Sequence, residues 1–211
     1  MVSKNGLRKM KSTVTDFLRH GEPVGTSTYR GNGVDDPLSV KGWSQMWNAV
    51  GDFCPWDVVI CSPLSRCKSF ADALGEKHSI PVKVDARIKE VGFGCWEGRE
   101  RKEIQSNNPD EYEAFYKDPV NCRPAGAEPL VEFENRVSAA FEDINEKFSG
   151  QHILVVSHAG VIRAAMKLVS QKSAAEVYGM KVGNASFTRL IHTGTGTKLE
   201  FHNRSSLQNS K

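Results

Sequence analysis

The chain of 211 residues has the length of a single domain that buries both faces of a sheet, and its composition, 39% hydrophobic and 25% charged, is that of an ordinary globular protein. Its 28 basic and 25 acidic side chains leave a net charge of +3, which is too small to indicate nucleic acid or a membrane surface as a partner. No stretch approaches the roughly 18 apolar residues of a membrane span, and no apolar signal core follows the basic N-terminus, so a cytoplasmic location is expected.

The predicted elements alternate between strand and helix along the chain. Short runs rich in β-branched residues predict strands, and these lie at 13–18, 57–61, 80–84 and 152–157. Longer stretches between them predict helices, at 39–51, 64–77, 110–116, 129–148 and 159–170. Ser39 is the predicted N-cap of the first helix, and Gly51 and Gly75 are predicted helix stops.

The end of the chain has a different pattern. Residues 185–192 and 197–202 flank Gly194-Thr195-Gly196 and predict a hairpin, which gives the sheet an antiparallel edge. Strands that alternate with helices predict an α/β fold with three layers, α/β/α, around a mainly parallel mixed sheet. We therefore expect one domain over residues 13–202. A basic extension that need not be ordered precedes it at 1–12, and a solvated tail follows it at 203–211.

The cysteines do not predict a metal site. They are five in number and scattered, without the close pairs of a zinc ligand set, and stand at Cys54, Cys61, Cys67, Cys95 and Cys122. In a chain without a signal peptide this pattern predicts reduced thiols that pack as small hydrophobic residues in or near the core.

Four segments place polar and charged residues just after strand-like runs or in the loops that follow them. These segments are Arg19-His20-Gly21-Glu22, Ser62-Pro63-Leu64-Ser65-Arg66, Glu90 to Gly98, and Val155 to Gly160, which ends in Ser157-His158-Ala159-Gly160. Because the carboxyl ends of parallel strands meet at one edge of a sheet, these segments are expected to converge there. The tetrapeptide at 19–22 alone would be a weak signal, and its weight comes from the other three.

The converging residue types suit phosphoryl transfer. Arg19 and Arg66 supply planar guanidinium groups that bind phosphate oxygens bidentately, and His158 adds a donor if it is protonated. The helix beginning near Ala159 is expected to offer free backbone N–H groups and the positive end of its dipole. If Arg66 instead had only a structural role, it would pair with a carboxylate of its own helix, such as Asp72.

A nucleophile and an acid complete the set. Neutral His20 can attack phosphorus to give a phosphohistidine, and surrounding positive charge favours the neutral form of a group that otherwise titrates near ~6.5. Glu90 can protonate the leaving group and then activate water. Glu97 is the alternative acid, although a structural role is the better interpretation of it. This chemistry requires no metal and no cofactor, and the chain offers no cluster of metal ligands.

With these residues in this order, the sequence resembles the histidine phosphatase superfamily in its phosphoglycerate-mutase-like branch, over nearly the whole chain from Thr15 to about Leu190. The resemblance implies that His20 is phosphorylated, that Glu90 is the proton donor, and that Arg19, Arg66 and His158 bind the phosphate. Within the superfamily, segments 19–22, 37–42 and 91–98 look most like those of bacterial α-ribazole phosphatases. Pro23 departs from the threonine or serine of many members, which affects the leaving-group side of the pocket.

The resemblance implies a metal-independent phosphomonoesterase that acts on a small substrate, and the favoured substrate is α-ribazole 5′-phosphate. The expected pocket walls, 23–30, 93–96 and the insertion 90–128, carry aromatic residues but few surplus bases, which disfavours a substrate with two phosphates. The alternatives are a phosphoglycerate mutase, a sugar or broad-specificity phosphatase, a phosphoprotein phosphatase and a non-catalytic phosphate-binding module. Aromatic candidates for the walls are Tyr29, Trp96, Phe115 and Tyr116.

Overall fold

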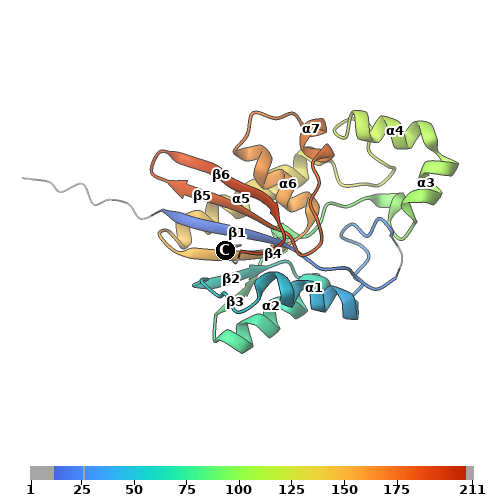
Figure 1. The fold of residues 1–211 in the computed structure, drawn as a ribbon. Coiled ribbons are helices and arrows are strands. Elements are labelled where there is room, and N and C mark those ends of the chain that lie inside the picture. The colour runs from blue at the N-terminus through green and yellow to red at the C-terminus, as the bar shows by residue number, and fades with distance from the viewer. Residues whose placement is uncertain (1–11, 26, 208–211) are drawn as a thin grey trace, which may run out of the picture.

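The computed structural model describes residues 12–25 and 27–207, in which one sheet has helices on both faces (Figure 1). The strands are β1 (Thr13–Arg19), β2 (Val58–Cys61), β3 (Val82–Val84), β4 (His152–Ser157), β5 (Phe187–Thr193) and β6 (Gly196–Arg204). The helices are α1 (Val40–Val50), α2 (Ser65–His78), α3 (Arg101–Asn107), α4 (Pro109–Lys117), α5 (Leu130–Lys147), α6 (Ala159–Leu168) and α7 (Ala174–Gly179), with short 3₁₀ turns η1 (Ala86–Ile88) and η2 (Gly94–Trp96).

The sheet is mixed, as the sequence predicted. Across it the strands are ordered β3-β2-β4-β1-β5-β6, and the first four run parallel. Strand β5 is antiparallel to both β1 and β6, so the C-terminal hairpin forms the antiparallel edge. The prediction of an α/β fold with an antiparallel edge near the C-terminus is confirmed.

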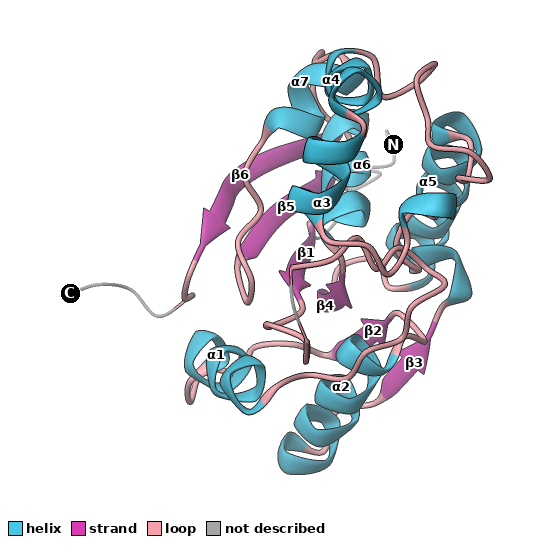
Figure 2. Ribbon diagram, turned by 90° about the vertical axis from the view of Figure 1, so that its right-hand side faces the viewer, coloured by secondary structure: helices cyan, strands magenta, loops and turns pink. Residues whose placement is uncertain are grey.

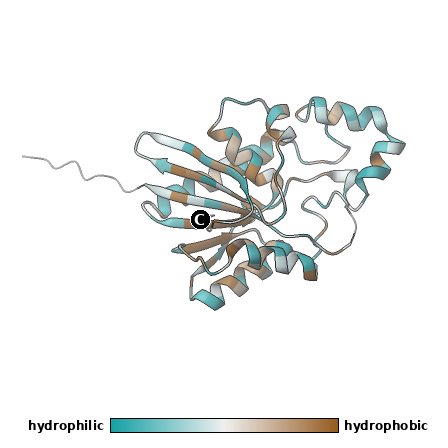
Figure 3. Ribbon diagram, viewed as in Figure 1, coloured by the Kyte–Doolittle hydropathy of each residue, from teal (hydrophilic) through white to brown (hydrophobic). Residues whose placement is uncertain are grey.

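Alternation along the central strands supplies both core layers. Phe17 packs with α5 and α6 on one face, and its neighbour Leu18 packs with α1 and α2 on the other. The same alternation places Val155 and Val156 on opposite faces, and all four side chains are at most 2% exposed. Burying each contributes about 1.5–3 kcal/mol, and the apolar centre of the sheet is visible in Figure 3.

The helix ends confirm two of the three predicted signals. Ser39 caps α1 by accepting from the Gly42 N–H, and Gly51 ends that helix with φ at 57°. The predicted stop at Gly75 is wrong, because α2 continues to His78 and ends at Ser79 in the left-handed region. Gly75 lies against β3 instead: a Cβ there would stand 2.3 Å from a Val82 methyl group, so the residue permits a close approach.

Two helices are absent from the sequence-based prediction. Helix α3 buries only Ile104, so it has no apolar periodicity to detect, and α7 is six residues long. The capping box at Ser173 and Glu176 was the available signal for α7. Strand β6 also continues through residues 203 and 204, which had been assigned to the tail. Most of the predicted N-terminal extension and the last four residues of the tail lie outside the described residues.

In Figure 2 the carboxyl ends of the parallel strands face the viewer. Two segments lie at this end of the sheet: the insertion between β3 and α5, and the segment after α6. Helices α4 and α7 contact each other there. Within the described ranges, no helix is long and apolar enough to cross a membrane.

Candidate active site

The four segments identified in the sequence meet at this edge of the sheet. Arg19 ends β1 and His20 follows it, while Arg66 lies in the first turn of α2. Ser157 ends β4, and the backbone N–H of His20 donates to its carbonyl oxygen at 3.0 Å. Glu90 follows η1. Chain order and the parallel strands thus bring residues some 140 positions apart into one site.

His20 is held in one ring orientation. Its Nδ1 lies 2.7 Å from the Gly21 carbonyl oxygen, which only accepts, so Nδ1 carries the proton and donates it. The lone pair of a neutral ring is therefore on Nε2. Burial, reinforced by the charges of Arg19 and Arg66, holds the pKa of His20 well below its usual value. A buried, neutral imidazole with a free Nε2 is the form that attacks phosphorus.

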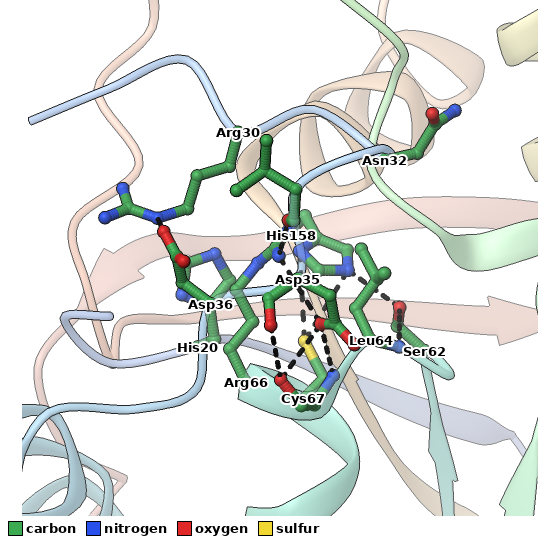
Figure 4. A network of polar contacts seen from close by, with 12 residues as sticks. His20, Arg30, Asn32, Asp35, Asp36, Ser62, Leu64, Arg66, Cys67 and His158 are labelled. Carbon is green, nitrogen blue, oxygen red and sulfur yellow. Dashed lines mark hydrogen bonds and ion pairs between the residues drawn. The ribbon is translucent and has the colours of Figure 1, made fainter. Parts of the chain in front are cut away.

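Arg66 is buried and fixed by the loop above it. Its two terminal nitrogens donate to the carbonyl oxygens of Val34 at 2.9 Å and Gly31 at 2.8 Å. Asp35 on the same loop caps the start of α2 by accepting from the Ser65 N–H at 2.7 Å (Figure 4). The alternative partner on the helix, Asp72, is paired with Lys68 instead. The guanidinium is therefore positioned by backbone oxygens rather than neutralised at close range by a carboxylate of α2.

Arg19 is the second guanidinium of the site. One of its terminal nitrogens donates to the Val182 carbonyl oxygen at 2.6 Å. The pKa of Arg19 is lowered to about 10, chiefly by burial. The Glu90 carboxylate acts to raise this pKa, and the neighbouring arginines act to lower it. The group therefore stays charged at neutral pH. The Nε atoms of Arg19 and Arg66 are both buried without a hydrogen-bond partner among the described residues. Two unsatisfied cationic donors beside a neutral histidine form a site for an anion.

His158 lies deeper than the sequence implied. It is fully buried, and its ring contacts the His20 ring edge-on with centroids 5.2 Å apart (Figure 4). Its Nε2 lies 2.8 Å from the Ser62 hydroxyl and 3.6 Å from the Cys67 sulfur. Burial, with the charge of Arg66, holds the pKa of His158 well below its usual value. In this placement His158 packs behind His20 and is not among the residues that line the cavity. Its role as a phosphate donor when protonated stays a prediction.

Glu90 does line the cavity. Its Oε1 accepts from the backbone N–H groups of Val91 at 3.0 Å and Gly160 at 3.1 Å. The helix beginning near Ala159 was expected to offer free backbone N–H groups, and one of these, that of Gly160, donates to the Glu90 carboxylate. A Cβ on Gly160 would stand 2.2 Å from Glu90 Oε1, so a side chain at this point of α6 would displace the carboxylate from its present position.

The alternative acid, Glu97, is placed elsewhere. Its Oε1 accepts from the backbone N–H of Phe93 at 2.9 Å and of Asn32 at 3.2 Å. A Cβ on Gly31 or Gly33 would collide with this carboxylate. Glu97 thus ties the loop that holds Arg66 to η2, and it does not line the cavity.

The cavity over these residues has a volume of about 570 Å³. Tyr29, Phe115 and Tyr116 line it, as anticipated, but Trp96 is buried behind them, with its ring 5.1 Å from both Tyr29 and Phe115. Phe93, in the expected wall 93–96, lines it too, and one aromatic side chain that lines the cavity, Tyr178, lies outside the expected walls.

The cavity is more basic than its expected walls. Among the described residues, six cationic side chains and one carboxylate, that of Glu90, line it, but only Arg30 and Arg101 of the six belong to the walls at 23–30, 93–96 and 90–128. The six are Arg19, Arg30, Arg66, Arg101, Arg163 and Lys181. Arg101, Arg163 and Lys181 come from α3, α6 and the segment after α7, none of which carries a recognisable motif at that position.

The remaining polar chemistry is limited in the described part of the chain. All five cysteines are free, with Cys61 and Cys67 buried, Cys95 exposed and the other two in between. No group of three or more histidine, cysteine, aspartate or glutamate side chains with metal-binding geometry occurs among the described residues.

The chain belongs to the histidine phosphatase superfamily (branch 1), whose sequence profile matches residues 16–205. An adenosylcobalamin/α-ribazole phosphatase of Escherichia coli is 30% identical over 150 residues, covering 69% of this chain and 73% of that protein. Phosphoserine phosphatase 1 of Hydrogenobacter thermophilus is 27% identical over 179 residues, covering 83% and 84%. The solved α-ribazole phosphatase of Shigella flexneri has the same fold, with a TM-score of 0.78, 24% identity, and coverage of 94% and 100%.

The fold is accordingly that of the phosphoglycerate-mutase-like histidine phosphatases. The protein is a phosphoric monoester hydrolase.

Proposed function

We propose that the protein hydrolyses a small phosphomonoester in two steps through a phosphohistidine at His20. In the first step the Nε2 lone pair forms a bond to phosphorus while the ester P–O bond breaks, and Glu90 as a carboxylic acid gives its proton to the departing oxygen. In the second step Glu90 takes a proton from water, the water oxygen bonds to phosphorus, and the P–N bond returns its electron pair to Nε2.

The observation that carries this proposal is the orientation of His20 between two arginines. The Nδ1–H bond to the Gly21 carbonyl leaves Nε2 as the attacking atom, and the unpartnered Nε atoms of Arg19 and Arg66 are available to phosphate oxygens. Charge that develops on the transferring phosphoryl group is then met by preorganised donors without a metal.

The experiment that tests the proposal is pre-steady-state hydrolysis of excess p-nitrophenyl phosphate by the wild type and by His20→Ala. The wild type should release p-nitrophenolate in a burst that matches the enzyme concentration if dephosphorylation is the slower step, and His20→Ala should lose several orders of magnitude in rate. Near-normal turnover by His20→Ala would contradict the proposal.

Two substrates are favoured by different walls of the cavity. The aromatic side chains Tyr29, Tyr116 and Tyr178 support a flat ring, and α-ribazole 5′-phosphate has one; the name of the Escherichia coli relative adds support. The surplus of cations supports a leaving group that carries a carboxylate, as in O-phosphoserine, the substrate in the name of the Hydrogenobacter thermophilus relative. Comparing kcat/KM for these two substrates and for a bisphosphate also tests the mutase alternative.

A further inference from the structure

Three cations of the cavity are not needed for the phosphate that reacts. Arg19 and Arg66 face a phosphate dianion beside His20, with Asp35 at 3.9 Å from a terminal nitrogen of Arg66, and Arg30 is paired with Asp36 at 2.8 Å. The remaining three, Arg101, Arg163 and Lys181, line the same cavity, and within the described ranges none of them forms an ion pair with a carboxylate. Even with the Glu90 carboxylate beside them, the cations that line this cavity outnumber its carboxylates, which favours the binding of a second anion.

The three cations are attached to fixed parts of the fold. Arg163 donates to the Met180 carbonyl oxygen from Nε at 3.2 Å and from a terminal nitrogen at 2.9 Å, and its burial lowers its pKa. Lys181 is the next residue after Met180, so its backbone is anchored at the same point. Arg101 stands over the Tyr29 ring, with its guanidinium carbon 5.3 Å from the ring centroid.

These groups surround the leaving-group side of the cavity. Tyr29 donates to or accepts from the Tyr116 hydroxyl at 2.8 Å, which joins the loop after β1 to α4. Tyr178 on α7 lies beside Arg163, 5.9 Å from ring centroid to guanidinium carbon. Arg101 and Arg163 therefore stand beside aromatic side chains of the loop after β1 and of α7. His20 and the two arginines proposed to bind the phosphate instead belong to the sheet edge and α2.

We propose that Arg101, Arg163 and Lys181 form a subsite for a second anionic group on the substrate, a carboxylate or a second phosphate carried by the leaving group. This subsite rests on the proposed phosphatase function and narrows its substrate to a phosphate ester that is also an acid. A neutral aromatic leaving group would make no ionic contact with these three cations, whereas an acidic one would add charge-assisted hydrogen bonds.

The test compares substrates that differ only in this second charge. 3-Phosphoglycerate and glycerol 3-phosphate share the reacting phosphate but differ by a carboxylate, and fructose 1,6-bisphosphate and fructose 6-phosphate differ by a phosphate. The wild type should prefer the more charged member of at least one pair by about 10- to 100-fold in kcat/KM, the range expected for a charge-assisted contact. The pair that shows the preference identifies the anion.

Variants then locate the subsite. The double variant carries Arg101→Gln and Lys181→Gln, both at exposed side chains. Its preference for the more charged substrate, measured as the ratio of kcat/KM values, should fall to below about threefold. The matched control is Arg99→Gln, two residues before Arg101, because Arg99 pairs with Glu103 and does not line the cavity. The control should keep the wild-type preference.

A binding measurement separates this inference from the proposed chemistry. Calorimetric affinities of the same two pairs for His20→Ala should show the same preference without turnover, so the subsite would stand even if phosphohistidine chemistry failed. Hydrolysis of p-nitrophenyl phosphate without a preference in either pair would leave the phosphatase proposal intact and overturn the subsite. A preference that survives in the double variant would equally overturn the assignment to these residues.

Discussion

Replacing Glu90 by glutamine separates proton transfer from the architecture of the site. The side-chain oxygen of glutamine can still accept from the N–H groups of Val91 and Gly160, so the contacts at 3.0 and 3.1 Å are retained. Only the transferable proton and the negative charge are lost. The melting temperature should therefore change little, while turnover falls.

The size of the loss follows from the proposed role of Glu90 as general acid. For an alkyl ester, whose leaving oxygen needs a proton, kcat/KM should fall by about 100- to 10,000-fold. That range corresponds to about 2.7–5.4 kcal/mol of activation free energy, at about 1.36 kcal/mol for each factor of ten. p-Nitrophenyl phosphate should lose less than about tenfold, since p-nitrophenolate departs without a proton.

The assay is steady-state hydrolysis of glycerol 3-phosphate and of p-nitrophenyl phosphate by wild type, Glu90→Gln and Glu97→Gln. Glu97 serves as the matched control because it accepts from backbone N–H groups outside the cavity. Its substitution should therefore not change the ratio of kcat/KM for the two esters. Equal losses on both esters in Glu90→Gln would refute the role as acid, and a selective loss on the alkyl ester in Glu97→Gln would transfer that role.

Three further predictions concern metal, pH and the arginine under the loop. Prolonged dialysis against EDTA should leave turnover intact and vanadate should inhibit, because Arg19 and Arg66 supply the positive charge; recovery with Mg²⁺ or Zn²⁺ after a loss would argue against this. His20 and His158 are kept neutral in the fold, so below pH ~6.5 only the unfolded chain binds their protons. Chemical denaturation without ligand should thus show the unfolding free energy falling between pH 6.5 and 5.5, by up to about 1.4 kcal/mol per pH unit for each histidine; an increase would contradict these pKa directions. Arg66→Met should lower kcat/KM for every phosphate ester, and a loss confined to one substrate would show that Arg66 does not bind the common phosphate.

Much of the site was predictable because its residues are adjacent to strand signals. The apolar run before Arg19 and His20 fixes them at the end of β1, and the parallel crossover brings Arg66 and Glu90 to the same edge. The position of a residue along the chain does not show, however, how deeply its side chain is buried. His158 follows β4 as expected, but the packing of Ser62 and Cys67 around it buries the ring behind His20.

The leaving-group side was not predictable, for a physical reason. Arg101 begins a helix that buries a single residue, and Lys181 follows a helix of six, so neither stands in a periodic pattern. In a linear sequence such residues resemble an ordinary solvated surface. Only the folding of α3, α4 and α7 over the sheet edge collects these charges around one cavity. Likewise, the occupation of the Gly160 N–H by Glu90 depends on a contact between residues 70 positions apart.

The identity of the phosphorylated atom tests the central claim most directly. The wild type is quenched in base during turnover of a phosphate ester, digested, and the phosphopeptide is analysed by mass spectrometry and phosphorus NMR. Because Nδ1 donates to the Gly21 carbonyl, the phosphate should be base-stable, acid-labile and attached to Nε2 of His20, and it should be absent from His20→Ala. Phosphate on Nδ1, on His158 or on a carboxylate, or turnover with no phosphoenzyme at all, would contradict the account.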